Sequence, residues 1–249
     1  MSDAIFWADA IFWRNELASA APNQSAILAV SRLERGPLLQ PAETTMILYY
    51  QTHSPFARKA LVFAHEVGLA DRLEVIHHET SPTLRNASVY AENPLGKVPV
   101  LLRPDAPPLF DSDVICAYLD TLHDGRKLLP QDGEARWQAL RLQAVAQGLA
   151  QTGIGLRWET ERRPEQLRYA ALAEGYREKI EASYDWIESA LDDETPLHVG
   201  HIALATTLSW MAFRQLPSFR ARARLTRWFE AFEKRRSMQA TPLSGDTHD

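Results

Sequence analysis

The chain has 249 residues, of which 45% are hydrophobic and 24% charged, and its formal net charge is −5. This length suits one large domain or two small ones, and the acidic balance gives no electrostatic case for nucleic acid, which binds basic faces. The single cysteine excludes an intrachain disulfide framework and any CxxC metal or redox pair. Apolar runs stay well short of the roughly 20 residues that span a membrane. We therefore expect a soluble protein of a reducing compartment.

The N-terminal stretch differs from the rest of the chain. It contains a tandem hexamer, Asp3 to Ala8 followed by Asp9 to Arg14, and it lacks the basic start and clean apolar segment of a signal peptide. A linker-like sequence, RGPLLQPAETT, follows it. We expect residues 1–45 to be a poorly ordered extension. The alternative is an aromatic arm that packs on a partner subunit.

Residues 46–123 predict alternating strands and helices. The run MILYY from Met46 is short, apolar and β-rich, which indicates a buried strand. Ser54 then has the character of a helix N-cap, and Pro55 that of a first helical residue. The sequence RLEVIHH (residues 72–78) predicts a second strand. Strand, helix and strand so close together indicate a parallel βαβ unit.

The second half of this region centres on ENPLGKVPVLL (residues 92–102), an apolar strand with Pro99 inside it. Proline cannot donate to a β-ladder, and a cis peptide bond before Pro99 would explain its presence. A short hairpin strand at residues 108–110 and a helix capped by Ser112 follow. The predicted order is βαβ, a connecting turn or short helix, and then ββα.

Residues 134–236 contain helical patterns and no convincing strand. The first pattern, residues 134–151, places Trp137, Leu140 and Ala144 on one side of a helix. Three further helices are expected, at residues 165–192, at residues 199–214 and from Pro217 onward. The middle one is apolar nearly all round, which predicts a central buried position.

These features together resemble the cytosolic glutathione S-transferase superfamily. The resemblance rests on the βαβ-α-ββα order, the Ser-Pro helix start, NPLGKVPVL and LFDSDVICAYL, with serine where cysteine-type members have cysteine, as in a bacterial serine-type member. It implies an α/β thioredoxin-like N-terminal domain followed by an all-α C-terminal domain. The implied divisions are an extension (1–45), a glutathione-binding domain (46–123), a linker (124–133), an all-helical domain (134–243) and a tail (244–249).

In this family the sulfur of glutathione lies at the N-terminus of the first helix, so the resemblance implies a catalytic role for Ser54. A thiol with a pKa of about 8.5 is mostly protonated at neutral pH. Helix N–H groups, the helix dipole and a hydrogen bond donated by a hydroxyl all favour the thiolate. Thr52 is the alternative donor, because serine-type members vary in the offset between hydroxyl and proline, and Tyr50 is a weaker one. Ser54 could also serve only as a helix cap, and capping is compatible with a hydrogen bond from the same hydroxyl to the sulfur.

The resemblance also implies how the rest of glutathione is held. The backbone of Val98, turned outward by cis-Pro99, would pair with the cysteinyl unit, and Lys97 would meet the glycyl carboxylate. Ser112 and its helix N–H groups would take the γ-glutamyl carboxylate, while Asp111 would face the ammonium. Many members of the family have glutamate at the position of Asp111, and the aspartate of this chain reaches less far toward the ammonium.

The implied function is a glutathione transferase acting on a small hydrophobic electrophile, which would lie between the domains beside Gly155 and Trp158. Conjugation, dehalogenation, ether cleavage and isomerisation share the thiolate step, and the sequence does not select among them. A cytoplasmic homodimer is implied as well. The alternative is a non-catalytic binding or scaffold protein of the same fold, although the retained candidate ligands argue for a working site.

No metal site is expected. The sequence HEVGL begins like the zinc motif HExxH, but Leu69 stands where the second histidine is needed. His77 and His78 are adjacent on a strand and so point to opposite faces. His198 and His201 have helical spacing without a third ligand.

Two positions also bear on the structure. His198 and His201 stand where the family often has the Ser/Thr and Asp of a capping box, so we expect this cap to be absent. Cys116 lies within a helical pattern and is expected to be a small buried apolar residue.

Overall fold

The computed structural model describes residues 45–192 and 194–247. Everything below concerns the compact unit Glu43–Asp249. The predictions for the N-terminal extension up to residue 44 lie outside the described residues.

A four-stranded mixed sheet forms the first part of this unit, with the strand order β2-β1-β3-β4. β1 and β2 are parallel, whereas β3 is antiparallel to both β1 and β4. The strands are β1 (Met46–Tyr50), β2 (Leu73–His77), β3 (Val100–Arg103) and β4 (Ala106–Leu109). The helices around them are α1 (Pro55–Glu66), a 3₁₀ turn (Ala70–Arg72), α2 (Ala87–Glu92) and α3 (Ser112–Leu119). This arrangement confirms the predicted βαβ-α-ββα order and the thioredoxin-like fold.

The rest of the described chain is helical, as predicted. The helices are α4 (Gly133–Arg157), α5 (Ala170–Ala190), α6 (Val199–Phe213), α7 (Ala223–Glu233) and α8 (Arg236–Gln239). A π-helical turn (Trp158–Arg162) and two 3₁₀ turns (Glu165–Leu167 and Phe219–Ala221) connect them. The expected starts at residue 165 and at Pro217 were too early, because those segments form 3₁₀ turns or loops before α5 and α7 begin.

α4 is longer than the sequence indicated, since it runs on through Gly153 and Gly155. A Cβ at Gly153 would lie 2.8 Å from the sulfur of Met211, and one at Gly155 would lie 2.6 Å from a ring carbon of Tyr176. These glycines therefore let α6 and α5 approach α4 closely. They do not end the helix, which continues to Arg157.

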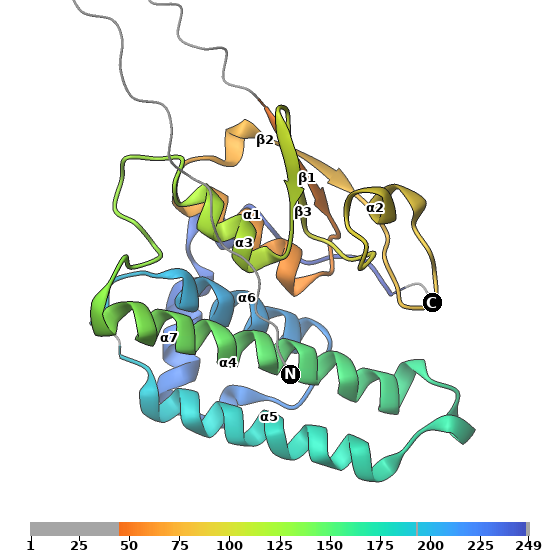
Figure 1. Ribbon diagram of the computed structural model, residues 1–249. Coiled ribbons are helices and arrows are strands. Elements are labelled where there is room, and N and C mark those ends of the chain that lie inside the picture. The colour runs from red at the N-terminus through yellow and green to blue at the C-terminus, as the bar shows by residue number, and fades with distance from the viewer. Residues whose placement is uncertain (1–44, 193, 248–249) are drawn as a thin grey trace, which may run out of the picture. The chain divides into compact units, whose positions relative to one another are not determined.

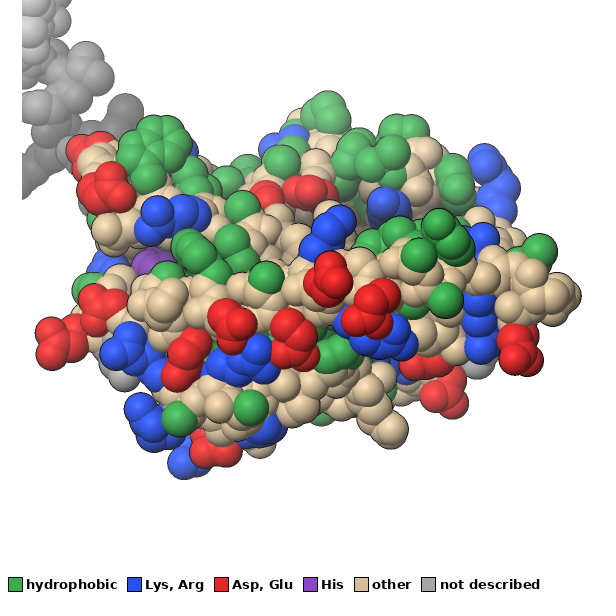
Figure 2. All heavy atoms as spheres, turned by 90° about the horizontal axis from the view of Figure 1, so that it is seen from below, with side chains coloured by type: hydrophobic (Ala, Val, Ile, Leu, Met, Phe, Trp, Pro, Cys, Tyr) green, Lys and Arg blue, Asp and Glu red, His purple; other side chains and the backbone are tan. Residues whose placement is uncertain are grey.

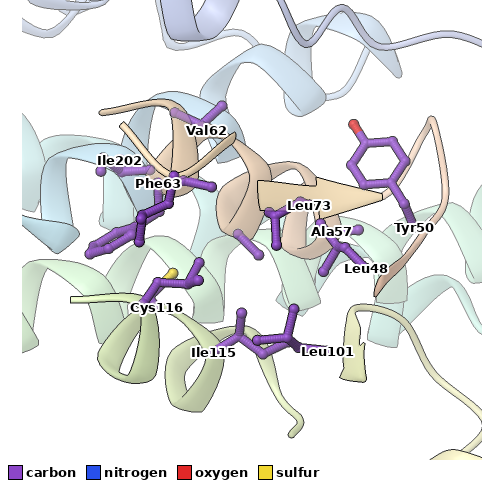
Figure 3. Packing of buried hydrophobic residues seen from close by; sticks show 14 of the residues in the cluster. Leu48, Tyr50, Ala57, Val62, Phe63, Leu73, Leu101, Ile115, Cys116 and Ile202 are labelled. Carbon is purple, nitrogen blue, oxygen red and sulfur yellow. The ribbon is translucent and has the colours of Figure 1, made fainter. Parts of the chain in front are cut away.

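One hydrophobic cluster joins the sheet, α1 and α3 to the helical part. α1 and α3 lie between the sheet and helices α4 and α6 (Figure 1). The cluster includes Leu48 of β1, Phe63 of α1, Ile115 of α3 and Ile202 of α6, all fully buried (Figure 3). Cys116 lies within it, and burial raises the pKa of its thiol to about 12. This confirms the expected apolar role of Cys116 and leaves it unsuited to nucleophilic chemistry.

The surface carries both signs of charge. Figure 2 shows one face of the molecule, on which acidic and basic side chains alternate without forming a single-sign patch. Across residues 45–192 and 194–247, no helix is long and apolar enough to cross a membrane. The same residues contain no cluster of histidine, cysteine and carboxylate side chains arranged to hold a metal ion.

The N-terminus of the central helix α6 is capped by two histidines, so the expectation that a cap would be absent was wrong. The Nδ1 atom of His198 accepts a hydrogen bond from Gly200 N (3.1 Å), and Nδ1 of His201 accepts one from His198 N (3.4 Å). The two rings stack with centroids 3.8 Å apart. Imidazole nitrogens thus replace the oxygens of an ordinary capping box, provided that both rings stay neutral.

This cap is expected to make stability fall in mild acid. Burial lowers the pKa of His198 from 6.5 to about 4 and that of His201 to about 3, with Arg126 and the neighbouring imidazole adding to the effect. Because both folded-state pKa values are depressed, their contribution is complete above about pH 6.5 and is lost as the pH falls toward 4. Urea unfolding at a series of pH values measures this slope.

The matched variant is the double substitution His198→Ser with His201→Asp, which supplies a capping box without imidazoles. We expect its stability to be nearly flat between pH 6.5 and 5, where neither new side chain titrates. An equal slope in the variant and the wild type would show that other groups cause the acid sensitivity.

Candidate functional site

A cavity of about 450 Å³ lies between the N-terminus of α1 and the C-terminal ends of α4 and α6. The α/β part lines it with Ser54, Lys97 and Val98, among others, and the helical part lines it with Ile154, Arg157, Arg162, Trp210 and Arg214. Three of the residues selected from the sequence therefore share one cavity wall.

Ser54 is the N-cap of α1, as predicted. Its backbone is extended, and its Oγ accepts a hydrogen bond from Ala57 N at 3.2 Å. That bond uses a lone pair of the oxygen, so the hydroxyl hydrogen remains able to be donated. The loop before Ser54 is fixed by the indole of Trp210, whose Nε1 donates to His53 O at 3.1 Å. The side chain of Ser54 is thus held at the cavity wall by both parts of the molecule.

The two alternative hydroxyls are placed differently. Thr52 Oγ1 donates to the carbonyl of Ser244 at 2.8 Å, and Ser244 N donates back to Thr52 O at 3.2 Å. Thr52 does not line the cavity. Tyr50 is buried in β1, and burial raises its pKa to about 12 despite the nearby charge of Arg58. Of the three candidate hydroxyl residues, Ser54 alone lines the cavity.

The loop before β3 contains the cis peptide bond that the sequence predicted. The Val98–Pro99 peptide bond is cis. Val98 lines the cavity, and its N–H and C=O have no hydrogen-bond partner within the described ranges. The side chain of Asn93 holds the loop by donating from Nδ2 to Lys97 O at 2.8 Å. A backbone segment with a free donor and acceptor is suited to pairing with a peptide-like ligand.

Asp111 and Ser112 lie at the start of α3, but the residue that caps the helix is not the one predicted. Asp111, not Ser112, is the N-cap, because its Oδ1 accepts from Asp113 N at 3.0 Å. Ser112 is the first helical residue and only 1% exposed, and its Oγ donates to Gln147 Oε1 at 3.3 Å. Neither residue lines the cavity described above. The capping prediction for Ser112 was wrong because the aspartate competes successfully for the same helix N–H groups.

Gly155 and Trp158 are also absent from the cavity wall. Gly155 faces Tyr176 of α5, and the ring of Trp158 packs against Arg162, whose Cζ lies 4.1 Å from the ring centroid. The same stretch of chain does reach the cavity, but through Ile154 and the two arginines of the α4 end and the π-helical turn.

The sequence reasoning missed the basic side of the cavity. Arg157, Arg162 and Arg214 come from the ends of two helices that are far apart in the sequence. The available signal was the arginine-rich sequence RWETERR that begins at residue 157, directly after the two glycines. It is an ordinary helix C-terminal pattern, so only the tertiary structure shows that it borders a cavity.

A carboxylate lies just behind the cavity wall. Glu79 accepts a hydrogen bond from Gln51 Nε2 at 2.8 Å, and its Oε2 lies 3.8 Å from His53 Nε2. Burial disfavours its ionised form, but hydrogen bonds from Gln51 and His77 outweigh burial and lower the pKa of Glu79. Glu79 is therefore charged at neutral pH and anchors the loop that carries Ser54.

A buried ion pair fixes α1 to α3 and α4. The ammonium of Lys59, a residue only 1% exposed, contacts the carboxylate of Asp113. Gln147 of α4 completes the network: its Oε1 accepts from Lys59 Nζ at 3.3 Å, and its Nε2 donates to Asp113 Oδ2 at 2.7 Å. The helix whose N-terminus faces the cavity is thus tied to both parts of the protein one turn beyond Ser54.

A second buried cation fixes α1 to the C-terminal segment. Arg58 is 3% exposed, and its guanidinium donates to Ser209 Oγ at 2.6 Å and to Met238 O at 3.1 Å. It also donates to Thr241 Oγ1 at 3.3 Å. These neutral acceptors satisfy the buried donors without a direct carboxylate partner.

Comparison with known proteins agrees with this architecture. A family profile described as the N-terminal domain of glutathione S-transferase matches residues 53–122. The uncharacterized GST-like protein YibF of Escherichia coli (strain K12) is 30% identical over 168 residues, which cover 66% of this chain and 80% of that protein.

Two solved structures extend the likeness to the helical part. A glutathione transferase family member from Pseudomonas fluorescens Pf-5 with bound glutathione is 32% identical, with a TM-score of 0.77 over 81% of this chain and 100% of that one. A family member from the same organism with bound S-(propanoic acid)-glutathione is 29% identical, with a TM-score of 0.73 over 80% and 100% of the two chains. The chain belongs to the glutathione S-transferase superfamily.

Proposed function

We propose that this protein is a glutathione transferase, which binds glutathione, ionises its thiol and transfers the sulfur to a small electrophile. The observation that carries the proposal is the position of Ser54. Ser54 lines the same cavity as the first residues of α1 and as Val98, which follows Lys97 and precedes cis-Pro99. Two related structures, one with bound glutathione and one with a bound glutathione adduct, support this choice of ligand.

The proposed chemistry at the sulfur follows from elementary electrostatics. A thiolate near Ser54 would accept a hydrogen bond from its hydroxyl and would lie at the positive end of the α1 dipole. Both interactions act on the anion and not on the neutral thiol, so they lower the thiol pKa. Ser54 therefore takes the role of a catalytic residue that touches the reacting sulfur.

We place the rest of the tripeptide along the α/β wall. The free N–H and C=O of Val98 would pair with the cysteinyl unit, and the Lys97 ammonium would meet the glycyl carboxylate. The start of α3, with Asp111 and Ser112, remains the proposed site for the γ-glutamyl end. Binding there requires the ligand to extend beyond the cavity described above.

The transfer step is a nucleophilic attack by sulfur. The thiolate electron pair forms a C–S bond to the electrophilic carbon. In a substitution the leaving group departs with its bonding electrons; in an addition to an activated alkene, the displaced pair is protonated on carbon. The related structure from Pseudomonas fluorescens Pf-5 contains bound S-(propanoic acid)-glutathione, which has a C–S bond of the kind that such a transfer forms.

The proposal is tested by calorimetric titration with glutathione, followed by a conjugation assay with chlorodinitrobenzene. We expect saturable binding, and catalysis above the rate of free glutathione. Binding without catalysis of any electrophile, or no binding at all, would instead favour the non-catalytic binding or scaffold protein. The cytoplasm, where glutathione keeps thiols reduced, is the compartment proposed for this activity.

We also propose a homodimer formed through α3 and α4. A groove of about 320 Å³ lies between these helices and is lined by Val114, Ala117 and Leu140. Val114 is 45% exposed, and Trp137, one turn before Leu140, is 62% exposed. The side of α4 on which the sequence placed Trp137 and Leu140 thus lies at the surface of the protomer, where a second copy would cover it.

Trp137→Glu is expected to convert this dimer to a monomer at about micromolar concentration, because a central interface tryptophan contributes about 2 kcal/mol or more. Sedimentation velocity measures the change. The matched control is Leu167→Glu, at a residue that is 60% exposed on a 3₁₀ turn outside the groove, and it should leave the dimer intact. A wild-type protein that sediments as a monomer would contradict the proposal.

A further inference from the structure

The cavity wall supplied by the helical part is basic. Arg157 ends α4, Arg162 ends the π-helical turn that follows it, and Arg214 lies at the C-terminal end of α6. All three line the cavity that Ser54 also lines. A substituent on a sulfur held by Ser54 would therefore extend toward guanidinium groups.

Arg214 has hydrogen-bonding capacity that the protein leaves unused. Its Nε and Nη2 atoms are buried and have no hydrogen-bond partner among the residues the structure describes. Its Cζ lies 4.6 Å from the centroid of the Phe213 ring, which holds the flat guanidinium in place. Buried donors without an acceptor are costly, so a ligand that brought an acceptor to this wall would gain affinity from it.

The arginines at this wall act on one another and on nearby carboxylates. Arg157 Nε lies 3.0 Å from Glu161 Oε2, and its Nη1 donates to Thr247 Oγ1 at 3.1 Å. Burial and the positive charges of Arg157 and Arg162 lower the pKa of Arg214, while Asp246 and Glu161 act in the opposite direction. The arginines thus repel one another, and an added anion would relieve that repulsion.

The remaining wall is apolar. Phe56 from α1, Ile154 from α4 and Trp210 from α6 line the same cavity. The space next to the sulfur therefore combines apolar contact surface with a basic end.

We infer that the second substrate is an electrophile with a small apolar body and a carboxylate, and that Arg214 binds this carboxylate while Arg157 and Arg162 add to the attraction. A planar guanidinium with two free N–H groups matches a carboxylate in a paired geometry. The inference rests on the proposed function, because the position of the sulfur sets where the carboxylate lies. The inferred substrate has the small hydrophobic body expected from the sequence, and it carries a negative charge in addition.

The experiment compares two glutathione adducts that differ only at the end of the substituent. S-carboxyethylglutathione ends in a carboxylate, and S-carbamoylethylglutathione ends in the neutral amide of nearly the same shape. Calorimetry should show that the wild type binds the carboxylate about tenfold or more tightly than the amide, since a charge-assisted hydrogen bond is lost in the amide. Arg214→Gln should bring this ratio close to one while glutathione affinity stays within about twofold.

The matched control is Arg220→Gln, at an exposed arginine that pairs with Glu230 outside the cavity, and it should keep the wild-type ratio. If Arg214→Gln fails to fold, the wild-type ratio and the Arg162→Gln variant still decide the question. Equal affinity of the wild type for the two adducts, with glutathione bound normally, would overturn the inference and leave the proposed function standing. An equal loss of affinity for glutathione itself in Arg214→Gln would also overturn it, because the arginine would then bind a carboxylate of the tripeptide. Failure of the wild type to bind glutathione or either adduct would defeat the proposed function itself.

Discussion

Replacing Asp113 with alanine is expected to lower the free energy of unfolding by about 3–5 kcal/mol, because it leaves the buried ammonium of Lys59 without its counter-ion. Lys59 is 1% exposed, and the only other described partner of its ammonium is the amide oxygen of Gln147. A neutral acceptor cannot offset the cost of keeping a charge out of water. Urea unfolding at neutral pH measures the loss.

The two halves of this pair should not be equivalent. The carboxylate of Asp113 is 34% exposed and also accepts from Gln147 Nε2, so Lys59→Met leaves a charge that water and the amide still solvate. We expect Lys59→Met to cost roughly 1–2 kcal/mol, less than Asp113→Ala. The double variant Lys59→Met with Asp113→Ala should recover much of the free energy of unfolding that Asp113→Ala alone loses. Additive losses in the double-mutant cycle would contradict a coupled pair.

Ser54→Ala is expected to have the largest effect on activity. Loss of one hydrogen bond to a charged group costs about 1.5–3 kcal/mol, which corresponds to roughly one to two units of thiol pKa. At neutral pH the transfer rate should therefore fall by about 10- to 100-fold. The pH–rate profile should also move to higher pH. Steady-state kinetics with chlorodinitrobenzene across a pH series measures both effects.

The control for this variant is Thr52→Val. Thr52 donates its hydroxyl to the carbonyl of Ser244, so its loss should loosen the C-terminal segment without shifting the pH–rate profile. A profile that moves in Thr52→Val and stays in Ser54→Ala would transfer the catalytic role to Thr52. Loss of the Ser54 cap also costs about 1 kcal/mol of stability, and a thermal melt separates this from the effect on catalysis.

The sequence predicted those features that local patterns control. The N-cap at Ser54 and the order of strands and helices follow from capping residues and short apolar periods. The cis bond before Pro99 follows from a proline placed inside a strand pattern. The burial of Cys116 follows from its place on the apolar face of α3. Each of these signals lies within a dozen residues of chain.

Features that depend on contacts between distant residues could not be predicted in this way. Asp111 caps α3 in place of Ser112, whose hydroxyl donates to Gln147 on another helix. Gly155 does not line the cavity, and its lack of a side chain makes room for Tyr176. The histidine cap of α6 also escaped prediction, since imidazole accepts a hydrogen bond only in its neutral form, which the burial of His198 favours.

The candidate site was half predicted for the same reason. Ser54, Lys97 and Val98 belong to one short domain with a recognisable sequence. Arg157 and Arg214 come from helix ends separated by more than 50 residues, and no sequence period connects them. The sequence therefore predicts the proposed glutathione side of the cavity. The proposed second-substrate side depends on how α4 packs against α6, which the sequence does not predict.

The central claim is that this protein binds glutathione with its sulfur at the N-terminus of α1 and ionises it there. Titration of the ultraviolet thiolate absorbance of glutathione bound to the wild type tests that claim directly. We expect the bound thiol to titrate at least about one unit below the value of roughly 8.5 for a free thiol. A bound thiol that titrates like free glutathione would contradict the account, whatever the affinity of the complex.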